Sequence, residues 1–265
     1  MKSILVPVGS SKNAESHLQY AVDFARTFGA KVYVVQIYNV YTKAGTMIKI
    51  DHILERESVT FLKSHVNKID TKGVEVIVKT FKGKLIDTLE LACKTLDVDL
   101  ILLEPRTNSI KDEVYLGKTS GKIIKQTNIP ALIVPEGYKY RPIIYILMAL
   151  KSAIIKNDNA LAPLKTIKNQ FKSILNLLLV KTPFHVEGDF DVNEDLSVMI
   201  TKITHSENPT TFQGVLEHHK ENKPDLLCVV RRKRGFFVKL WESNTILKKD
   251  FHSSSLPVLV LSGLK

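Results

Sequence analysis

The densest run of positive charge in this chain follows a strand of the buried type near its C-terminal end. Residues 231–234 read Arg-Arg-Lys-Arg, and Phe236, Phe237 and Trp241 come soon after. Guanidinium groups hold phosphate or carboxylate through paired hydrogen bonds. The candidate anion-binding residues are therefore Arg231, Arg232 and Arg234. Two other interpretations stay open: a solvated loop that aids solubility, and a nucleic-acid surface on which the aromatic rings stack against bases.

Two observations disfavour nucleic acid as the partner of this cluster. Phe236, Phe237, Leu240 and Trp241 recur at helical spacing, which is more often a core or interface stripe than a stacking surface. The net charge of +11 is also divided almost evenly, with about +5 on residues 1–140 and about +6 on the remainder. An even spread is typical of solvated faces and not of a dedicated nucleic-acid domain.

No residue pattern gives positive support for catalysis. Among the eight histidines only His218 and His219 are adjacent, and neighbours on a helix point to different faces. No nucleophile elbow, HExxH pair or Walker-type loop occurs. Cys93 and Cys228 lie in apolar runs, without the spacing of a metal site. We therefore expect a protein that is not an enzyme and holds no metal.

Two segments about 127 residues apart follow the same plan. Each begins with a strand of the buried type, at 98–103 and at 224–230, and ends with a strand entered through proline. Repetition at about half the length of a 265-residue chain predicts one fold present twice. We expect a first domain over residues 1–138 and a shorter, more divergent second domain over 142–265.

Short apolar runs alternate with helix-length stretches throughout the chain. This alternation predicts α/β domains, each an open five-stranded parallel sheet of the doubly wound, Rossmann-like type. Ligands of such sheets bind beyond the C-terminal ends of the strands, where the strand order reverses. The first half should have strands at 3–8, 31–38, 74–81, 100–103 and 131–134, and helices at 14–28, 50–69, 85–96 and around 120–126. The second should have strands at 143–149, 174–180, 196–204, 225–230 and 257–261, and helices at 158–171, 211–221 and 244–252.

The second half departs from the first after its second strand. Residues 182–195 contain Pro183, Gly188 and five acidic residues. Proline and glycine both disfavour a helix interior, and the segment has no apolar stripe. The second helix should therefore be short or absent in this half.

On these features the chain resembles the universal stress protein family, in its tandem two-domain form. The resemblance rests on an ordered set of segments, namely the opening strand 4–8, Gly83 before the third helix, the strand 99–102 and the block 117–135. It implies two adenine nucleotide alpha hydrolase-like domains that pair through their last strands. A tandem chain of this kind is an intramolecular pseudo-dimer, and the family acts in the stress response.

One branch of that family binds ATP through an aspartate after the first strand and a loop with the spacing G-x2-G-x9-G-[ST]. Glycines let backbone amides approach phosphates, and the following helix N-terminus favours negative charge. In the first half Gly9 stands at the aspartate position, Glu104 and Thr107 at the first two glycine positions, and Lys118 at the serine position. By resemblance, the residues that would hold ATP or AMP here are Gly9, Ser11, Gly117, Lys118, Thr119 and Ser120.

The second half departs further from this pattern. No aspartate follows its first strand, where residues 149–152 read Ala-Leu-Lys-Ser. Arg231 and Arg234 take the two early glycine positions, and Asn244-Thr245 takes the place of Gly-Ser. The spacing of a phosphate loop is kept while the glycines are lost, so ATP binding in the family manner is not expected in this half.

We therefore expect a non-catalytic binding or regulatory protein with degenerate nucleotide sites. One alternative is an ATP-binding stress switch, with slow hydrolysis, in the first domain. Another is polyanion binding through the loop 231–234. The expected partners are a small anionic ligand or a protein, with a homodimer formed in addition to the domain pair. No apolar stretch reaches the roughly 18 residues of a membrane span. The run 4–8 is too short for a signal-peptide core, which predicts a cytoplasmic location.

Overall fold

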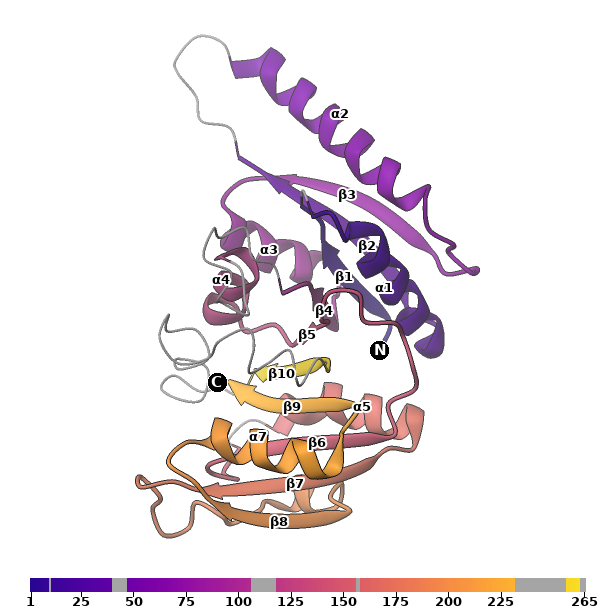
Figure 1. Cartoon of the computed structure of the whole chain (residues 1–265). Helices are drawn as coiled ribbons and strands as arrows, with labels where there is room; N and C mark the ends of the chain where they lie inside the picture. The colour runs from indigo at the N-terminus through magenta and orange to yellow at the C-terminus, as the bar shows by residue number, and fades with distance from the viewer. Residues whose placement is uncertain (10, 40–46, 106–117, 156–157, 232–255, 263–265) are drawn as a thin grey trace. The chain divides into compact units, whose positions relative to one another are not determined.

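The computed structural model describes residues 1–9, 11–39, 47–105, 118–155, 158–231 and 256–262 (Figure 1). The chain forms two compact units. The first comprises residues 1–104, 122–129 and 136–140, and the second comprises 105–121, 130–135 and 141–265.

The first unit contains a parallel sheet with the strand order β3-β2-β1-β4. Every residue of β4 is buried, as are Ser3–Val6 of β1, because helices cover both faces of such a sheet. The strands are β1 (Ser3–Pro7), β2 (Lys31–Tyr38), β3 (Val76–Lys82) and β4 (Leu100–Leu103). The helices of the first half are α1 (Ala14–Phe28), α2 (Met47–Val66), α3 (Leu85–Thr95) and α4 (Lys118–Gln126).

The second unit contains strands in the order β5-β10-β9-β6-β7-β8. The β5–β10 pair is antiparallel and the other described pairs are parallel, so the last strands of the two halves pair as the resemblance implies. The strands are β5 (Ala131–Ile133), β6 (Tyr145–Leu150), β7 (Ile174–Lys181), β8 (Lys202–Glu207), β9 (Leu226–Arg231) and β10 (Val258–Ser262). The helices are η1 (Asp158–Leu161), α5 (Ala162–Phe171), α6 (Glu194–Ser197) and α7 (Thr211–Asn222).

The predicted α/β doubly wound architecture is confirmed. The strand order reverses between β1 and β4 in the first unit and between β6 and β9 in the second. The second helix of the second half is reduced to the four residues of α6, as expected. The predicted helix 244–252 lies outside the described residues.

The predicted strand 196–204 was wrong in its first half. Residues 194–197 form α6, and β8 begins only at Lys202. The local cause is the side chain of Asn193, which caps the turn by accepting a hydrogen bond from the Leu196 N–H at 3.0 Å. Glu194 and Asp195 also place negative charge at the helix N-terminus, where it is favourable. The cap therefore overrides the strand propensity of the apolar residues that follow.

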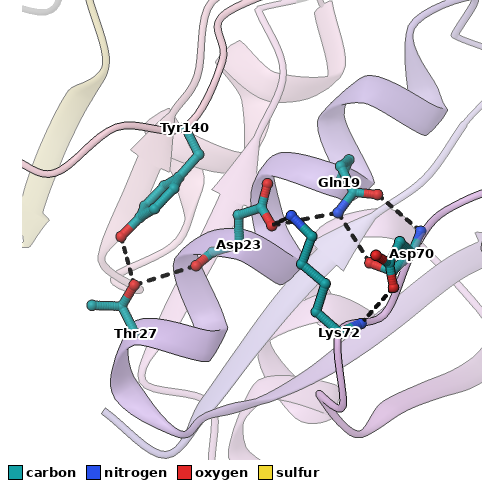
Figure 2. Close-up of polar contacts among 6 residues, drawn as sticks. All are labelled: Gln19, Asp23, Thr27, Asp70, Lys72 and Tyr140. Carbon is teal, nitrogen blue, oxygen red and sulfur yellow. Dashed lines mark hydrogen bonds and ion pairs between the residues drawn. The ribbon is translucent and has the colours of Figure 1, made fainter.

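Polar contacts fix α1 from its outer side (Figure 2). Gln19 exchanges two hydrogen bonds with the backbone of Asp70, at 2.9 and 3.0 Å, in the loop before β3. Lys72 forms an ion pair with Asp23 at 2.6 Å. Thr27 and Tyr140 share a hydrogen bond between their hydroxyl groups. The orientation of α1 is thus set by the loop before β3 and by the segment that follows β5.

The internal repeat is visible as a duplicated anchor. Asp99, just before β4, accepts hydrogen bonds from the backbone N–H groups of Lys2 and Ser3. Asp225, just before β9, accepts the N–H groups of Ile144 and Tyr145 at 3.0 and 2.9 Å. In both halves the carboxylate ties the fourth strand to the first.

The fit of α7 against the sheet depends on Gly214. A Cβ added there would lie 2.9 Å from Val180 Cγ2 and 3.0 Å from Ser206 Oγ. We expect Gly214→Val to lower the free energy of unfolding by about 2 kcal/mol, because the packed sheet must shift to admit the new atoms. The control is Gln213→Val, which places the same side chain at an exposed neighbouring position of α7. Valine has a higher helix propensity than glycine, so a loss of stability at Gly214 reports the packing. Chemical denaturation of both variants measures their free energies of unfolding. Equal losses in the two variants would contradict the close packing of Gly214 against the sheet.

Candidate functional site

Gly9 and Ser11 lie at the C-terminal end of β1, where the strand order of the first unit reverses. The Ser11 N–H donates to the Gly9 carbonyl at 2.8 Å, and the Asn13 N–H donates to Ser11 Oγ at 3.1 Å. These bonds form a tight turn that leads into α1. Both residues are partly exposed, so a ligand at this strand end can reach them.

His17, in the first turn of α1, is a residue that the sequence reasoning missed. Its side chain is 7% exposed and hydrogen-bonded with the backbone of Leu102 in β4. Burial lowers the pKa of His17 to about 4, so the ring is uncharged at neutral pH. Among the described residues, no group hydrogen-bonds to its Nε2 atom. The sequence did contain a signal for the burial of His17, because this residue lies one helical turn before the buried Ala21 and so on the same face of α1.

The remaining first-half candidates include the first three residues of α4. Lys118 begins α4, Thr119 is exposed and Ser120 is 6% exposed. These three residues belong to the second compact unit, whereas Gly9 and Ser11 belong to the first. Gly117 and Thr107 lie outside the described residues. Glu104, at the first glycine position, is partly exposed directly after β4.

The corresponding strand end of the second unit is covered by the chain itself. The Ala153 N–H, just beyond β6, donates to the Asp189 carbonyl at 2.6 Å. Burial raises the pKa of the Asp189 carboxyl, but hydrogen bonds from the Val186 N–H and the Ser152 side chain outweigh this effect. Together with the charges of His185 and Lys151, they leave the pKa below its usual value. The Asp189 carboxylate is therefore bound in its charged form at the end of β6.

Aromatic contacts hold this covering segment, residues 182–195, in place. The ring of Phe190 lies 4.4 Å from that of His185 and 5.6 Å from that of His205 in β8, between ring centroids. Gly188 has φ of 85°, a conformation that glycine adopts without strain. The Asp191 N–H then closes the turn on the Gly188 carbonyl at 3.0 Å. These contacts hold residues 182–195, which lead into the short α6, over the end of β6.

The basic cluster is only partly described. Arg231 is the last residue of β9, 8% exposed and in register with Ser262 of β10. It is therefore part of the sheet and not of the loop in which the sequence reasoning placed it. Arg232 and Arg234 lie outside the described residues.

The described residues offer little reactive chemistry outside these strand ends. Cys93 and Cys228 are free and buried, and burial raises the pKa of the Cys93 thiol to about 12 and that of Cys228 further. No group of three or more His, Cys, Asp or Glu residues is placed to hold a metal ion in the part of the chain that the structure describes. None of the described helices is long and apolar enough to span a membrane.

Comparison with known proteins identifies the family. The model of the universal stress protein family matches residues 1–135, just over half of the chain. The chain belongs to this family. One curated relative, universal stress protein MJ0531 of Methanocaldococcus jannaschii, is 22% identical over 143 residues, or 52% of this chain and 84% of the relative.

Solved structures resemble this universal stress protein over almost its whole length, and two of them illustrate the likeness. One is a universal stress protein from Archaeoglobus fulgidus, with 18% identity, a TM-score of 0.67 and coverage of 97% of this chain and 95% of that chain. The other is the functionally unknown protein PA1789 of Pseudomonas aeruginosa, with 15% identity, a TM-score of 0.56 and coverage of 98% and 92%. At these identities the likeness concerns the fold.

Proposed function

We propose that this universal stress protein acts by binding a small ligand or a protein partner, without turnover, and that both of its nucleotide sites are degenerate. The observation that carries the proposal is the cover over β6 in the second half. The Ala153 N–H and the Ser152 side chain, which sit where this fold class binds ligands, are engaged by Asp189 of the same chain. A nucleotide at this strand end would compete with Asp189 for these groups.

The first half also fits ATP poorly. Gly9 brings no carboxylate to the end of β1 for an adenosine group. Glu104 places a side chain and a negative charge where the family loop has glycine, and like charges repel phosphate. We therefore assign no catalytic step to a bound nucleotide.

A titration with Mg-ATP and with AMP tests this function. We expect no rise in melting temperature at about 5 mM nucleotide, because a bound ligand must stabilise the folded state by mass action. We also expect no phosphate release from ATP above the rate in buffer. A clear thermal shift, or phosphate release that follows the protein concentration, would overturn the proposal.

One observation favours the alternative of an ATP- or AMP-binding switch in the first half. The buried Nε2 atom of His17 has no hydrogen-bond partner among the described residues, and His17 contacts the backbone of β4 close to where the strand order reverses. Buried polar atoms are normally satisfied, so a bound group is one explanation. If nucleotide does raise the melting temperature, Gly117→Val should abolish the shift, since the added side chain would block the family's third glycine position.

A further inference from the structure

A recess lies in the C-terminal half, at the opposite end of the strands from the covered end of β6. It has a volume of about 200 Å³, and its lining residues lie where β6, β7 and β8 begin and in the last turn of α7. Its apolar wall includes Tyr145, Ile174 and Pro224. Tyr145 is 51% and Ile174 37% exposed, so large apolar side chains surround an open mouth.

Three other lining residues, Asn176, His218 and Asn222, are polar and hydrogen-bonded to one another. Asn176 of β7 and Asn222 of α7 each direct a side-chain nitrogen at His218 Nε2, at 3.1 and 3.2 Å. Thr204 Oγ1 donates to Asn176 Oδ1 at 3.3 Å, which fixes the orientation of that amide. The roles of the His218 ring nitrogens depend on its tautomer, and Nε2 can accept from an amide when the ring proton is on Nδ1.

The first half shows what the same place looks like when it is packed. Ser3 and Tyr145 are equivalent, because each donates its N–H to the duplicated aspartate. Their partners on the neighbouring strand, Lys31 and Ile174, are therefore equivalent too. Two residues further along that strand, the first half has Tyr33 and the second half has Asn176. Tyr33 is 6% exposed. The second half thus has a short amide where the first has a buried aromatic ring.

The helix that borders the recess shows the same exchange. Asp97 and Lys223 have φ of 49° and 40° and mark equivalent helix ends, two residues before the duplicated aspartate anchors. Counting back from them places His218 at the position of Ala92, which is 1% exposed. The buried Tyr33 and Ala92 of the first half are therefore replaced in the second half by Asn176 and His218, which are hydrogen-bonded to each other. Replacement of large core side chains by smaller ones would by itself leave an apolar cavity. It does not account for the hydrogen-bonded network of Asn176, His218 and Asn222.

The charge of the recess indicates the ligand. Lys202, the first residue of β8, lies on the lining, and the described lining residues include no carboxylate. The neighbouring Asp225 is already engaged by two backbone N–H groups and by Arg141 at 3.0 Å. Donor groups and one ammonium on a mainly apolar recess match a ligand with an apolar body and one anionic acceptor group.

We propose that this recess binds a small aromatic monocarboxylate, with its ring against Tyr145 and Ile174 and its carboxylate toward Lys202 and the Asn176 amide. The recess can hold one six-membered ring, since apolar cavities of about 150 Å³ admit benzene. This site is separate from the strand ends considered for nucleotide, and neither site depends on the other.

Ligand titrations followed by NMR test the assignment with benzoate as the probe and benzamide and benzylamine as neutral and cationic isosteres. We expect benzoate to shift the His218 ring signals with a Kd of about 1 mM or tighter, benzamide to bind more weakly and benzylamine not at all. Lys202→Met should weaken benzoate at least about fivefold and leave benzamide unchanged, because the variant removes only the charge. Benzylamine binding as tightly as benzoate, or no shift with benzoate at about 10 mM, would refute the site.

Two filling variants locate the binding. Asn176→Tyr restores the residue of the first half and should abolish the benzoate shifts by occupying the recess. Ile174→Trp should also abolish the benzoate shifts, because the larger side chain narrows the mouth of the recess. Ile174 is exposed, so this substitution should leave the fold intact. Melting curves show whether each variant is folded. Undiminished benzoate binding to a folded Ile174→Trp protein would show that the ligand binds elsewhere and would overturn the proposal.

Discussion

Acidification should remove about 3 kcal/mol of folding free energy through a single side chain, His17. Burial lowers the pKa of the folded protein's His17 from 6.5 to about 4, and each pKa unit corresponds to about 1.4 kcal/mol. Above pH 6.5 the ring is neutral in both states and contributes nothing. Between pH 6.5 and about 4 the unfolded chain takes up a proton that the folded protein does not, so stability falls as the pH falls. Below about pH 4 both states are protonated and the loss is constant.

The comparison of wild type with His17→Leu isolates this effect from the titration of carboxylates. Urea denaturation across this interval should show a shallower pH dependence for the variant, by about 3 kcal/mol in total. His52→Leu, a substitution at an exposed histidine in α2, is the control and should follow the wild type. Parallel curves for wild type and His17→Leu would mean that the buried ring accepts a proton in the folded state.

Removing the Asp225 carboxylate should be the other large change. Asp225→Ala leaves the N–H groups of Ile144 and Tyr145 without their acceptor, and the Asp225 side chain is only 16% exposed. We expect a loss of about 2–3 kcal/mol, because hydrogen bonds to a charged group are among the stronger ones. The equivalent Asp99→Ala should cost about 1 kcal/mol, since Asp99 is exposed and water can replace it.

Arg141→Ala separates the anchor from the ion pair that accompanies it. The Arg141 side chain is 56% exposed, so its pair with Asp225 should contribute less than about 1 kcal/mol. Calorimetric melting of the three variants gives the ranking. If Arg141→Ala were as damaging as Asp225→Ala, the ion pair and not the two backbone hydrogen bonds would hold β9 to β6.

The elements that sequence reasoning placed well are those with strong local signals. The bounds of α1, β2 and β4 agree with the structure residue for residue. For α1 the reason is a complete set of signals, with apolar spacing along the helix and Gly29 at its end in the left-handed conformation, φ 60°. The short second helix of the second half was likewise predictable, because Pro183 and Gly188 forbid a long one.

What escaped prediction depends on contacts between distant segments. The cover over β6 joins Ala153 to Asp189, and no local pattern states that residues 182–195 turn back over that strand end. The recess beside α7 needs the register of β7 against β8 and the facing of α7, neither of which a single sequence gives. His17 looked like an ordinary histidine, since its burial follows from the contact of α1 with β4.

The position of β5 in the sheet determines where the chain could be cut into two fragments. Ala131, Leu132 and Ile133 come from the first half of the sequence, yet they pair in register with Val260, Leu259 and Val258 in the second unit. A chain cut after residue 138 would carry this strand away with the N-terminal fragment. The C-terminal fragment would then present β10 as a bare edge, and bare edges recruit other chains. The two halves of the sequence are therefore not independent folding units, because β5 of the first half pairs with β10 of the second.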